Sequence, residues 1–280
     1  MPSSGYTKLT GEEEDRRLQL QNHAVRYFDE SVYRRVFGQY AAPRILDVGC
    51  GNGDMITYMT DESPACTIWG IDIVKRQIEL AAERHPEGHF HVLDIEQDCF
   101  LEEMHDHMGA EGISGFDVIN CSMVLMHLAD PVGALKKLKS ILADGGTLIV
   151  REVDDGIQRA FPDPENRFGK LLDIIAGDNR LGDRHCGRKV YSYLKNAGFS
   201  LVRLEKEGLS NISIPDRKLL YEMAIPAFFD YMKSRTENEP DNTEYRKAYE
   251  WYAANLDEIS KSFEREDFFI SLGFMSFTAM

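Results

Sequence analysis

The sequence predicts an α/β fold built on a doubly wound, mostly parallel sheet. Short apolar runs, typical of buried strands, alternate along the chain with amphipathic helical patterns. The first run, residues 45–48, leads directly into a turn with glycine at every second position. Three of the runs have an aspartate at or near their end, namely Asp47, Asp72 and Asp94. Because open α/β sheets bind ligands beyond the carboxyl ends of their strands, we expect these aspartates to share one site.

The composition narrows the class of protein. With 280 residues, of which 43% are hydrophobic and 28% are charged, the chain can bury the core of one domain with an insertion. The formal net charge of −15 disfavours nucleic acid as a partner, because such partners are bound through basic surfaces. No apolar run approaches about 18 residues, so the sequence predicts no membrane span. The oligomeric state is left open.

The five cysteines are predicted to be reduced thiols. Their number is odd, and none of them forms a C-x-x-C or other zinc-ligand spacing. Residues 1–22 also lack the charged-then-apolar pattern of a secretion signal. We therefore expect a cytoplasmic protein without a metal site. His105 and His107 lie in a polar stretch without a further run of ligands, so we expect them to be solvated.

Residues 1–40 are predicted to form an N-terminal helical cap, in which residues 1–10 are either flexible or a closing flap. Across residues 11–38, apolar residues recur at helical spacing. They are Leu18, Val25, Phe28, Val32 and Val36. The region also contains the rings of Tyr6, His23, Tyr27, Tyr33 and Tyr40. These rings either pack the helix onto the domain or cover a ligand.

The glycine-rich turn of residues 49–53 has two interpretations. Gly49 and Gly51 fit the first two positions of the dinucleotide-binding pattern G-x-G-x-x-G, but its third position falls on Asp54. An acidic side chain suits a pyrophosphate poorly, which favours a nucleoside ligand without that group. The glycines could also serve the geometry of a plain strand–turn–helix unit. Asp47, at the end of the strand before the turn, needs a partner if it is buried, such as a ligand amine or backbone N–H groups.

The second and third strands, residues 67–71 and 89–93, end at Asp72 and Asp94. Asp72 lies 19 residues past Gly53, which matches the acidic residue that binds ribose hydroxyls in nucleoside-binding α/β folds. A carboxylate suits a diol because it offers several acceptor sites. Alternatively, Asp72 caps the amphipathic helix predicted for residues 73–84. The two roles are compatible.

The stretch Asp47-Val48-Gly49-Cys50-Gly51-Asn52-Gly53 resembles the first motif of class I S-adenosylmethionine-dependent methyltransferases. The resemblance covers residues 40–155 and implies a Rossmann-like sheet of seven strands with S-adenosylmethionine as the cofactor. It implies that Asp94 binds the adenine amine and that the backbone of Ile95 reaches a ring nitrogen. The full set of cofactor-binding residues expected from these motifs is Asp47, Gly49, Cys50, Gly51, Asp72, Ile73, Asp94, Ile95, Cys121, Ser122 and Tyr27.

The fourth strand, residues 116–122, is followed by an apolar segment with a histidine, as in the same family. The resemblance places Asn120, Cys121 and Ser122 beside the methionine portion of the cofactor. The region lacks the Asn/Asp-Pro-Pro-Tyr motif of enzymes that methylate base or glutamine amides, which disfavours those substrates. His127 is either a catalytic base for a substrate hydroxyl or a structural residue that binds a loop above the sheet.

Beyond the fourth strand the sequence predicts the following elements. They are a helix over 130–142 closed by residues 144–146, a strand at 147–150, helices at 161–177 and 189–197, a strand at 200–204, helices at 216–234 and 243–263, and an antiparallel last strand at 268–277. Asp183, Arg184, His185 and Arg188 either cap the helix at 189–197 or form part of a substrate entrance. We expect a core of residues 41–214, a helical insertion over 215–265 that forms part of a substrate pocket, and a last core strand over 266–280. The aromatic residues of the insertion either pack its own core or line that pocket.

These patterns predict methyl transfer from S-adenosylmethionine to a small, aromatic or lipophilic acceptor by in-line displacement. One alternative is a binding protein that keeps the nucleoside site without catalysis. Another is a methyltransferase acting on protein or RNA. A nicotinamide-dependent oxidoreductase is disfavoured by Asp54. The sequence identifies neither the acceptor nor the atom that is methylated.

Overall fold

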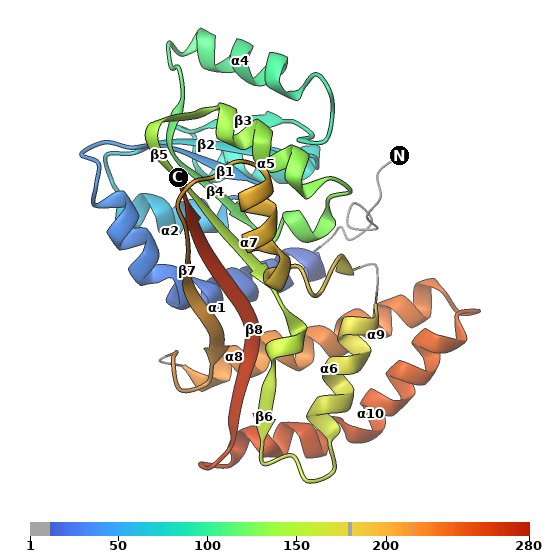
Figure 1. Ribbon diagram of the computed structural model, residues 1–280. Helices are drawn as coiled ribbons and strands as arrows, with labels where there is room; N and C mark the ends of the chain where they lie inside the picture. Colours follow the sequence, from blue (N-terminus) through green and yellow to red (C-terminus); the bar gives the residue numbers. More distant parts are fainter. Residues whose placement is uncertain (1–11, 179–180, 215) are drawn as a thin grey trace.

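A computed structural model describes residues 12–178, 181–214 and 216–280 (Figure 1). Its sheet has the strand order β3-β2-β1-β4-β5-β8-β6, and β7 pairs with the other side of β8. The strands are β1 (Arg44–Val48), β2 (Thr67–Asp72), β3 (His89–Val92), β4 (Phe116–Ser122), β5 (Leu142–Val153), β6 (Arg159–Phe161), β7 (Val202–Ser210) and β8 (Phe269–Ala279). The predicted doubly wound α/β fold is confirmed, but the sheet contains eight strands where seven were expected, because β6 was missed.

Five parallel strands form the half of the sheet that carries the predicted site. The strands β1 to β5 pair in parallel, and the register places Asp47 of β1 beside Gly70 of β2 and Asn120 of β4. The carboxyl ends of these strands therefore share one edge. Sequence positions that are far apart, such as Asp47 and Asn120, become neighbours there.

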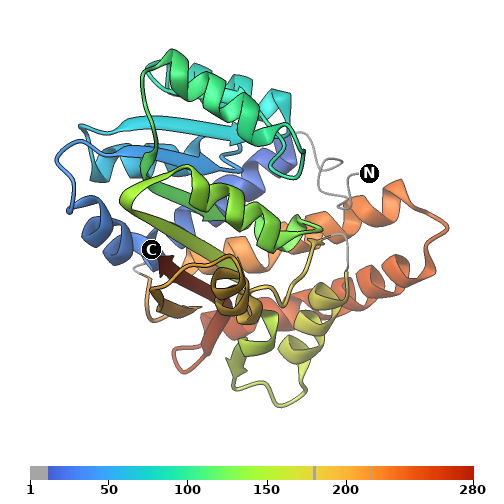
Figure 2. The ribbon, with the colours of Figure 1, turned by 45° about the horizontal axis from the view of Figure 1, so that its top comes forward.

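Helices cover both faces of this sheet, as Figure 2 shows. Apolar residues of α1 (Glu12–Phe37), α2 (Asp54–Glu62) and α3 (Lys75–Arg84) pack on one face, against Ile45, Ile68 and Val118. The helices α4 (Phe100–Ala110), α5 (Pro131–Ser140) and α7 (Gly187–Asn196) pack on the other face. Side chains alternate along a strand, so successive residues serve the two faces in turn. Residues 1–11, which include Tyr6 and the predicted flap, lie outside the described residues.

The strand β8 joins the parallel half of the sheet to the lower part of the molecule in Figure 1. Its residues 274–279 run antiparallel to β5, which confirms the predicted antiparallel last strand. Its first residues pair with β6, and β7 lies along its other side. A short 3-10 helix, η3 (Asp155–Ile157), separates β5 from β6, so both strands flank the same side of β8 in succession.

Several predicted elements have different bounds. The strand predicted at 147–150 is β5, Leu142–Val153, and the strand predicted at 200–204 is β7, Val202–Ser210. Residues 161–166 are not helical: β6 ends at Phe161, and α6 runs over Arg167–Gly177, where the Asp163 carboxylate accepts hydrogen bonds from the first backbone N–H groups. Residues 144–146 do not close a helix, because α5 ends at Ser140 and β5 already begins at Leu142.

The helix predicted for residues 216–234 is two helices, α8 (Arg217–Ala224) and α9 (Pro226–Asn238). Pro226 has no N–H group and its ring obstructs the preceding turn, so the helix breaks there. The hydroxyl of Tyr252, on α10 (Thr243–Glu264), donates to the carbonyl of Ile225 at the break, over 2.8 Å. Most aromatic rings of this insertion pack against one another or against α6, as in the Phe229–Tyr252 and Phe168–Phe263 pairs.

The described residues also bear on the predictions about membrane spans, metal sites, cysteines and the two histidines. None of the helices that the structure describes is long and apolar enough to cross a membrane. Within the described ranges, no three His, Cys, Asp or Glu side chains are arranged to hold a metal ion. All five cysteines are free thiols. His105 is exposed, as expected, but His107 stacks on His91 with ring centroids 3.7 Å apart and is not simply solvated.

Candidate functional site

The glycine-rich turn lies at the carboxyl end of β1 and is fixed to the neighbouring strand. The backbone N–H groups of Gly49 and Cys50 both donate to the carbonyl of Ile71, over 2.8 and 3.0 Å. Gly49, Gly51 and Gly53 all have positive φ angles, which favours glycine at each position. A Cβ atom on Gly51 would meet nothing within 4 Å. The backbone at Gly51 is therefore open to close approach by a ligand.

Asp72 lies beside this turn, at the end of β2. Its carboxylate accepts hydrogen bonds from the N–H groups of Gly51 (3.0 Å) and Val74 (2.9 Å). Burial raises the pKa of Asp72, and these backbone donors oppose the rise. The N-cap residue of α3 is Val74, so the alternative role of Asp72 as the helix cap is wrong. A carboxylate has about four acceptor positions, so Asp72 can accept further hydrogen bonds from a ligand.

Asp94 and Ile95 follow β3 on the same edge of the sheet. Asp94 is half-buried and accepts hydrogen bonds from the N–H of Glu96 (2.9 Å) and from the amide of Gln97 (3.1 Å). The side chain of Ile95 is buried in the core, so a ligand could meet its backbone but not its side chain. Ile73, by contrast, leaves 42% of its surface exposed next to Asp72.

Asp47 is buried at the end of β1. The side-chain amide of Asn120 donates to its carboxylate over 2.7 Å. Burial raises the pKa of Asp47 to about 7, while the Asn120 hydrogen bond and the charge of Arg151 act in the opposite direction. A buried carboxylate of this kind is a favourable partner for a cationic group of a ligand.

The remaining predicted cofactor residues differ in how deeply their side chains are buried. Ser122 is half-buried and its hydroxyl accepts a hydrogen bond from Arg151. The side chains of Cys50 and Cys121 are buried in the core, so their backbone groups are what the site could use. Tyr27, on α1, is half-buried, and its recorded ring contacts are with Arg26 and His23 of the same helix.

The segment after β4 is held by a residue that the sequence did not single out. Glu152, at the end of β5, is fully buried and accepts hydrogen bonds from the N–H groups of Val124 (2.9 Å) and Leu125 (2.6 Å). Burial raises the pKa of Glu152 to about 8, and these backbone donors oppose the rise. The sequence signal that could have identified Glu152 is an acidic residue at the end of an apolar run that predicts a strand.

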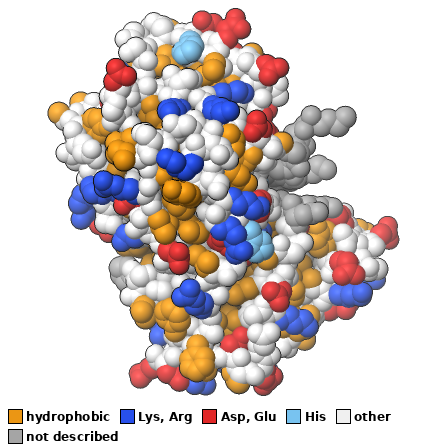
Figure 3. Space-filling view, viewed as in Figure 1, with side chains coloured by type: hydrophobic (Ala, Val, Ile, Leu, Met, Phe, Trp, Pro, Cys, Tyr) orange, Lys and Arg blue, Asp and Glu red, His pale blue; other side chains and the backbone are white. Residues whose placement is uncertain are grey.

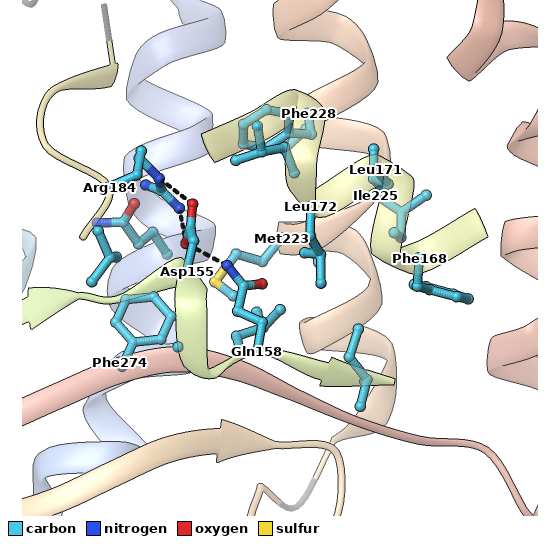
Figure 4. A pocket seen from close by; sticks show the side chains of 18 of the residues that line it. Asp155, Gln158, Phe168, Leu171, Leu172, Arg184, Met223, Ile225, Phe228 and Phe274 are labelled. Atoms are coloured by element: carbon cyan, nitrogen blue, oxygen red, sulfur yellow. Dashed lines mark hydrogen bonds and ion pairs between the residues drawn. The ribbon is translucent and has the colours of Figure 1, made fainter. Parts of the chain in front are cut away.

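Beyond the ends of β4 and β5 the molecule contains a cavity with about 770 Å³ of empty space, counting its opening to solvent (Figure 4). Its wall is mostly apolar, and its lining comes from α1, the ends of β4 and β5, α6, α8, α9 and β8. The apolar and aromatic lining residues include Met123, Phe168, Leu172, Met223, Phe228 and Phe274. His127 is not among the lining residues, and its ring packs against Gly182.

One end of the cavity is polar. Arg184 binds Asp155 through its Nε and Nη2 groups, over 2.8 and 2.9 Å, and the amide of Gln158 also donates to Asp155. Figure 4 shows Arg184 and Gln158 directed at Asp155, with Phe168 and Leu171 away from this group. Of the two roles considered for Asp183, Arg184, His185 and Arg188, a place at a substrate entrance fits Arg184, which lines the cavity. Arg188 is exposed and binds the buried carboxylate of Asp154.

Met123 connects the cavity with the edge of the sheet. It directly follows Ser122, the last residue of β4, and it lines the cavity. Its φ angle of 59° lies in the left-handed region, which is uncommon for residues other than glycine and costs on the order of 1 kcal/mol. Its backbone N–H donates to the carbonyl of Arg151 over 2.8 Å, which helps to fix this conformation. The cavity and the strand ends are thus adjacent.

The chain is similar in sequence to several proteins of known family. A family described as a methyltransferase domain matches residues 41–198. The ubiquinone biosynthesis O-methyltransferase of Actinobacillus pleuropneumoniae is 30% identical over 111 residues, which cover 40% of this chain and 46% of the relative. The tRNA U34 carboxymethyltransferase of Idiomarina loihiensis is 26% identical over 185 residues, which cover 62% of this chain and 47% of the relative. The chain thus spans less than half the length of these curated relatives.

A solved structure shares the fold. The structure of the plantazolicin methyltransferase BpumL in complex with SAH aligns with a TM-score of 0.51 and 14% identity. The alignment covers 95% of this chain and 86% of that one. It therefore extends beyond the region that the family match covers.

We expect alanine to be tolerated less well at Gly49 than at Gly51. Both residues have positive φ, so each substitution should destabilise the protein by roughly 1–2 kcal/mol through backbone strain. A Cβ atom on Gly49 would also lie 2.5 Å from Cγ2 of Val124, which should add about 1–3 kcal/mol. Urea unfolding of Gly49→Ala and Gly51→Ala measures the difference. Equal losses would contradict the close packing of the turn on the segment after β4.

Proposed function

This chain belongs to the methyltransferase-domain family, and from this premise we propose that it transfers a methyl group from S-adenosylmethionine to a small, mostly apolar acceptor. The observation that carries the proposal is one edge of the sheet at which Asp47, Asp72 and Asp94 flank an open glycine turn beside an apolar cavity. The bound SAH of the similar plantazolicin methyltransferase supports the same cofactor here.

The residues of the turn and the strand ends fit the parts of this cofactor. Asp72 has acceptor positions left for the ribose hydroxyls, and the exposed side chain of Ile73 lies next to it. Asp94 and the backbone of Ile95 would bind the adenine. The buried carboxylate of Asp47 would pair with the amino group of the methionine portion, which offsets the cost of burying that charge.

The cavity is the proposed acceptor site, and the helical insertion contributes Met223 and Phe228 to it. When bound, the cofactor's sulfonium supplies an electrophilic methyl group. The chain's own task is to hold the acceptor in line with that group and to exclude water, which the apolar walls favour. Because Asp155 neutralises Arg184, the polar end of the cavity carries no net charge. We therefore propose that the acceptor binds this end through a neutral polar group.

Two observations favour a small acceptor over RNA, although one relative is a tRNA enzyme. The net charge is −15, and basic and acidic side chains are interspersed over the face that Figure 3 shows. Among the described residues that line the cavity, the one cation is Arg184, and it is paired with Asp155. A catalytic role for His127 stays a prediction, since the acceptor would have to extend beyond the cavity lining to reach it. The free thiols support a cytoplasmic location.

Calorimetric titration with S-adenosylmethionine, S-adenosylhomocysteine and NAD tests the cofactor. We expect micromolar binding of both adenosyl compounds, about −8 kcal/mol, and no binding of NAD. If neither adenosyl compound binds, the proposed function is wrong. Binding without methyl transfer to any acceptor of a small-molecule panel would favour the non-catalytic alternative.

Replacing Asp72 with alanine should weaken S-adenosylhomocysteine binding by about 1–3 kcal/mol, because the ribose hydroxyls lose their acceptor. Calorimetry on Asp72→Ala measures the loss. Asp98→Ala, at an exposed position after β3, is the control and should bind like the wild-type protein. If the folded Asp72→Ala protein binds as tightly as the control, Asp72 does not hold the ribose.

Filling the cavity should block the acceptor but not the cofactor. Ala227, on α9, lines the cavity, so Ala227→Phe should occupy part of its space. We expect this variant to bind S-adenosylhomocysteine normally and to lose binding of Nile red, a neutral apolar dye, measured by fluorescence. Ala253→Phe, at an exposed position of α10, is the matched control. Unchanged dye binding in Ala227→Phe would place apolar ligands elsewhere.

A further inference from the structure

The helix α1 sends two buried polar side chains toward the cofactor edge of the sheet. Asp29 and Tyr33 are four residues apart, so they lie on one face of the helix, and both side chains are fully buried. Asp29 pairs with Arg151, which in turn binds the hydroxyl of Ser122. The Tyr33 hydroxyl donates to Oδ1 of Asn120 over 2.8 Å. Both chains of contacts end at the carboxyl ends of the parallel strands.

The chain of hydrogen bonds that begins at Tyr33 runs in one direction, toward Asp47. The Tyr33 hydroxyl donates to the carbonyl oxygen of the Asn120 side chain, and the amide nitrogen of Asn120 donates to Asp47 over 2.7 Å. Burial raises the pKa of Tyr33, so its hydroxyl keeps its proton. Each hydrogen bond polarises the next one, and both point their protons toward Asp47. Such a chain stabilises the ionised form of the carboxyl group at its end.

Other groups also face Asp47 and set its charge. The positive charge of Arg151, on β5, favours the carboxylate, but Asp29 of α1 offsets part of that charge. Asp72, on β2, disfavours the carboxylate. The thiols that interact with Asp47, Cys50 in the turn and Cys121 on β4, have pKa values raised by burial and stay neutral. The hydrogen bond from the Asn120 amide is therefore a main interaction that stabilises the ionised form of Asp47 and opposes the effect of burial.

We propose that Tyr33 is a positioning residue of the cofactor site, which fixes the side-chain amide of Asn120 so that the ionised form of Asp47 is favoured for binding a cationic amino group. Without the hydroxyl, the amide is free to turn its oxygen toward Asp47, an arrangement that suits only a protonated carboxyl group. The charge of Asp47 is thus set from α1, outside the glycine motif. The role in binding rests on the proposed function, whereas the effect on Asp47 does not.

The test is a titration of Asp47 by NMR of protein labelled with carbon-13 at the aspartate carboxyl groups. The Asp47 resonance is assigned with Asp47→Asn. In the wild-type protein its midpoint should lie near the pKa of about 7 that burial produces, and Tyr33→Phe should raise it. Calorimetry with S-adenosylhomocysteine from about pH 6 to about pH 7.5, where an α-amino group is largely protonated, gives the consequence for binding.

The sign of the pH effect follows from the carboxylate. The wild-type affinity should rise with pH as Asp47 ionises. In Tyr33→Phe the rise should move to higher pH, and affinity below both midpoints should fall by up to about tenfold for each pH unit by which the midpoint increases. The gap between the two affinities should narrow as the pH rises from about 6 to about 7.5, which loss of structure alone would not produce.

Tyr58→Phe is the matched control. The Tyr58 ring packs edge-on against Tyr33 at 5.7 Å, and its hydroxyl oxygen is buried without a hydrogen-bond partner among the described residues. Removing it changes the same cluster but leaves the chain to Asp47 intact, so the midpoint should not move. In an Asn120→Ala background, Tyr33→Phe should cause no further shift, because the link between the two residues is gone.

An unchanged midpoint in Tyr33→Phe, an equal shift in Tyr58→Phe, or a persistent effect of Tyr33→Phe in the Asn120→Ala background would each overturn the proposal. The failure of the proposed function looks different. A wild-type protein that binds no S-adenosylhomocysteine would remove that function, and the NMR titration would still decide whether Tyr33 controls the charge of Asp47.

Discussion

The burial of the Asp47 carboxyl group at the end of β1 is the constraint on which the rest of the site depends. An isolated carboxylate in such a place is costly, so its neighbours must supply hydrogen bonds and charge. The parallel register brings Asn120 alongside, and Arg151 approaches from β5. The pairing of Arg151 with Asp29 and the bond from Tyr33 then fix α1 against the same edge. The contacts around this one buried carboxyl group thus connect three strands and a helix.

Glu152 repeats this arrangement two strands away. It is also a buried acid at a strand end, but its partners are the backbone N–H groups after β4. The result is a fixed connection between the carboxyl edge of the parallel strands and Met123 at the cavity. Asp155 is a third case, because it orders Arg184 and Gln158 at the polar end of the same cavity. Each acid holds a different segment in place.

Much of the parallel half could be predicted because its signals are local. A short apolar run, a glycine turn and an acidic strand end are properties of neighbouring residues, and β1, β2 and β4 match their predicted ranges closely. The buried pairs Arg151–Asp29 and Arg184–Asp155 join residues far apart in sequence, so no local pattern reveals them. The short strand β6 was missed because its pairing with β8 supplies what its three residues lack in propensity. The cavity depends on how several helices meet, which periodicity does not specify.

The continuity of β8 has a mechanical consequence. One end of the strand is hydrogen-bonded to β5 inside the main sheet, while the other pairs with β6 and carries the cavity residues Ile270 and Leu272. An extended strand that is hydrogen-bonded on both sides resists bending. It therefore fixes the distance between the main sheet and the part of the cavity that β8 lines. Sequence drift in α8 and α9 can then reshape what the cavity accepts without changing where its contents sit relative to the sheet. For the acceptor site that we propose, selectivity and alignment therefore depend on different elements of the chain.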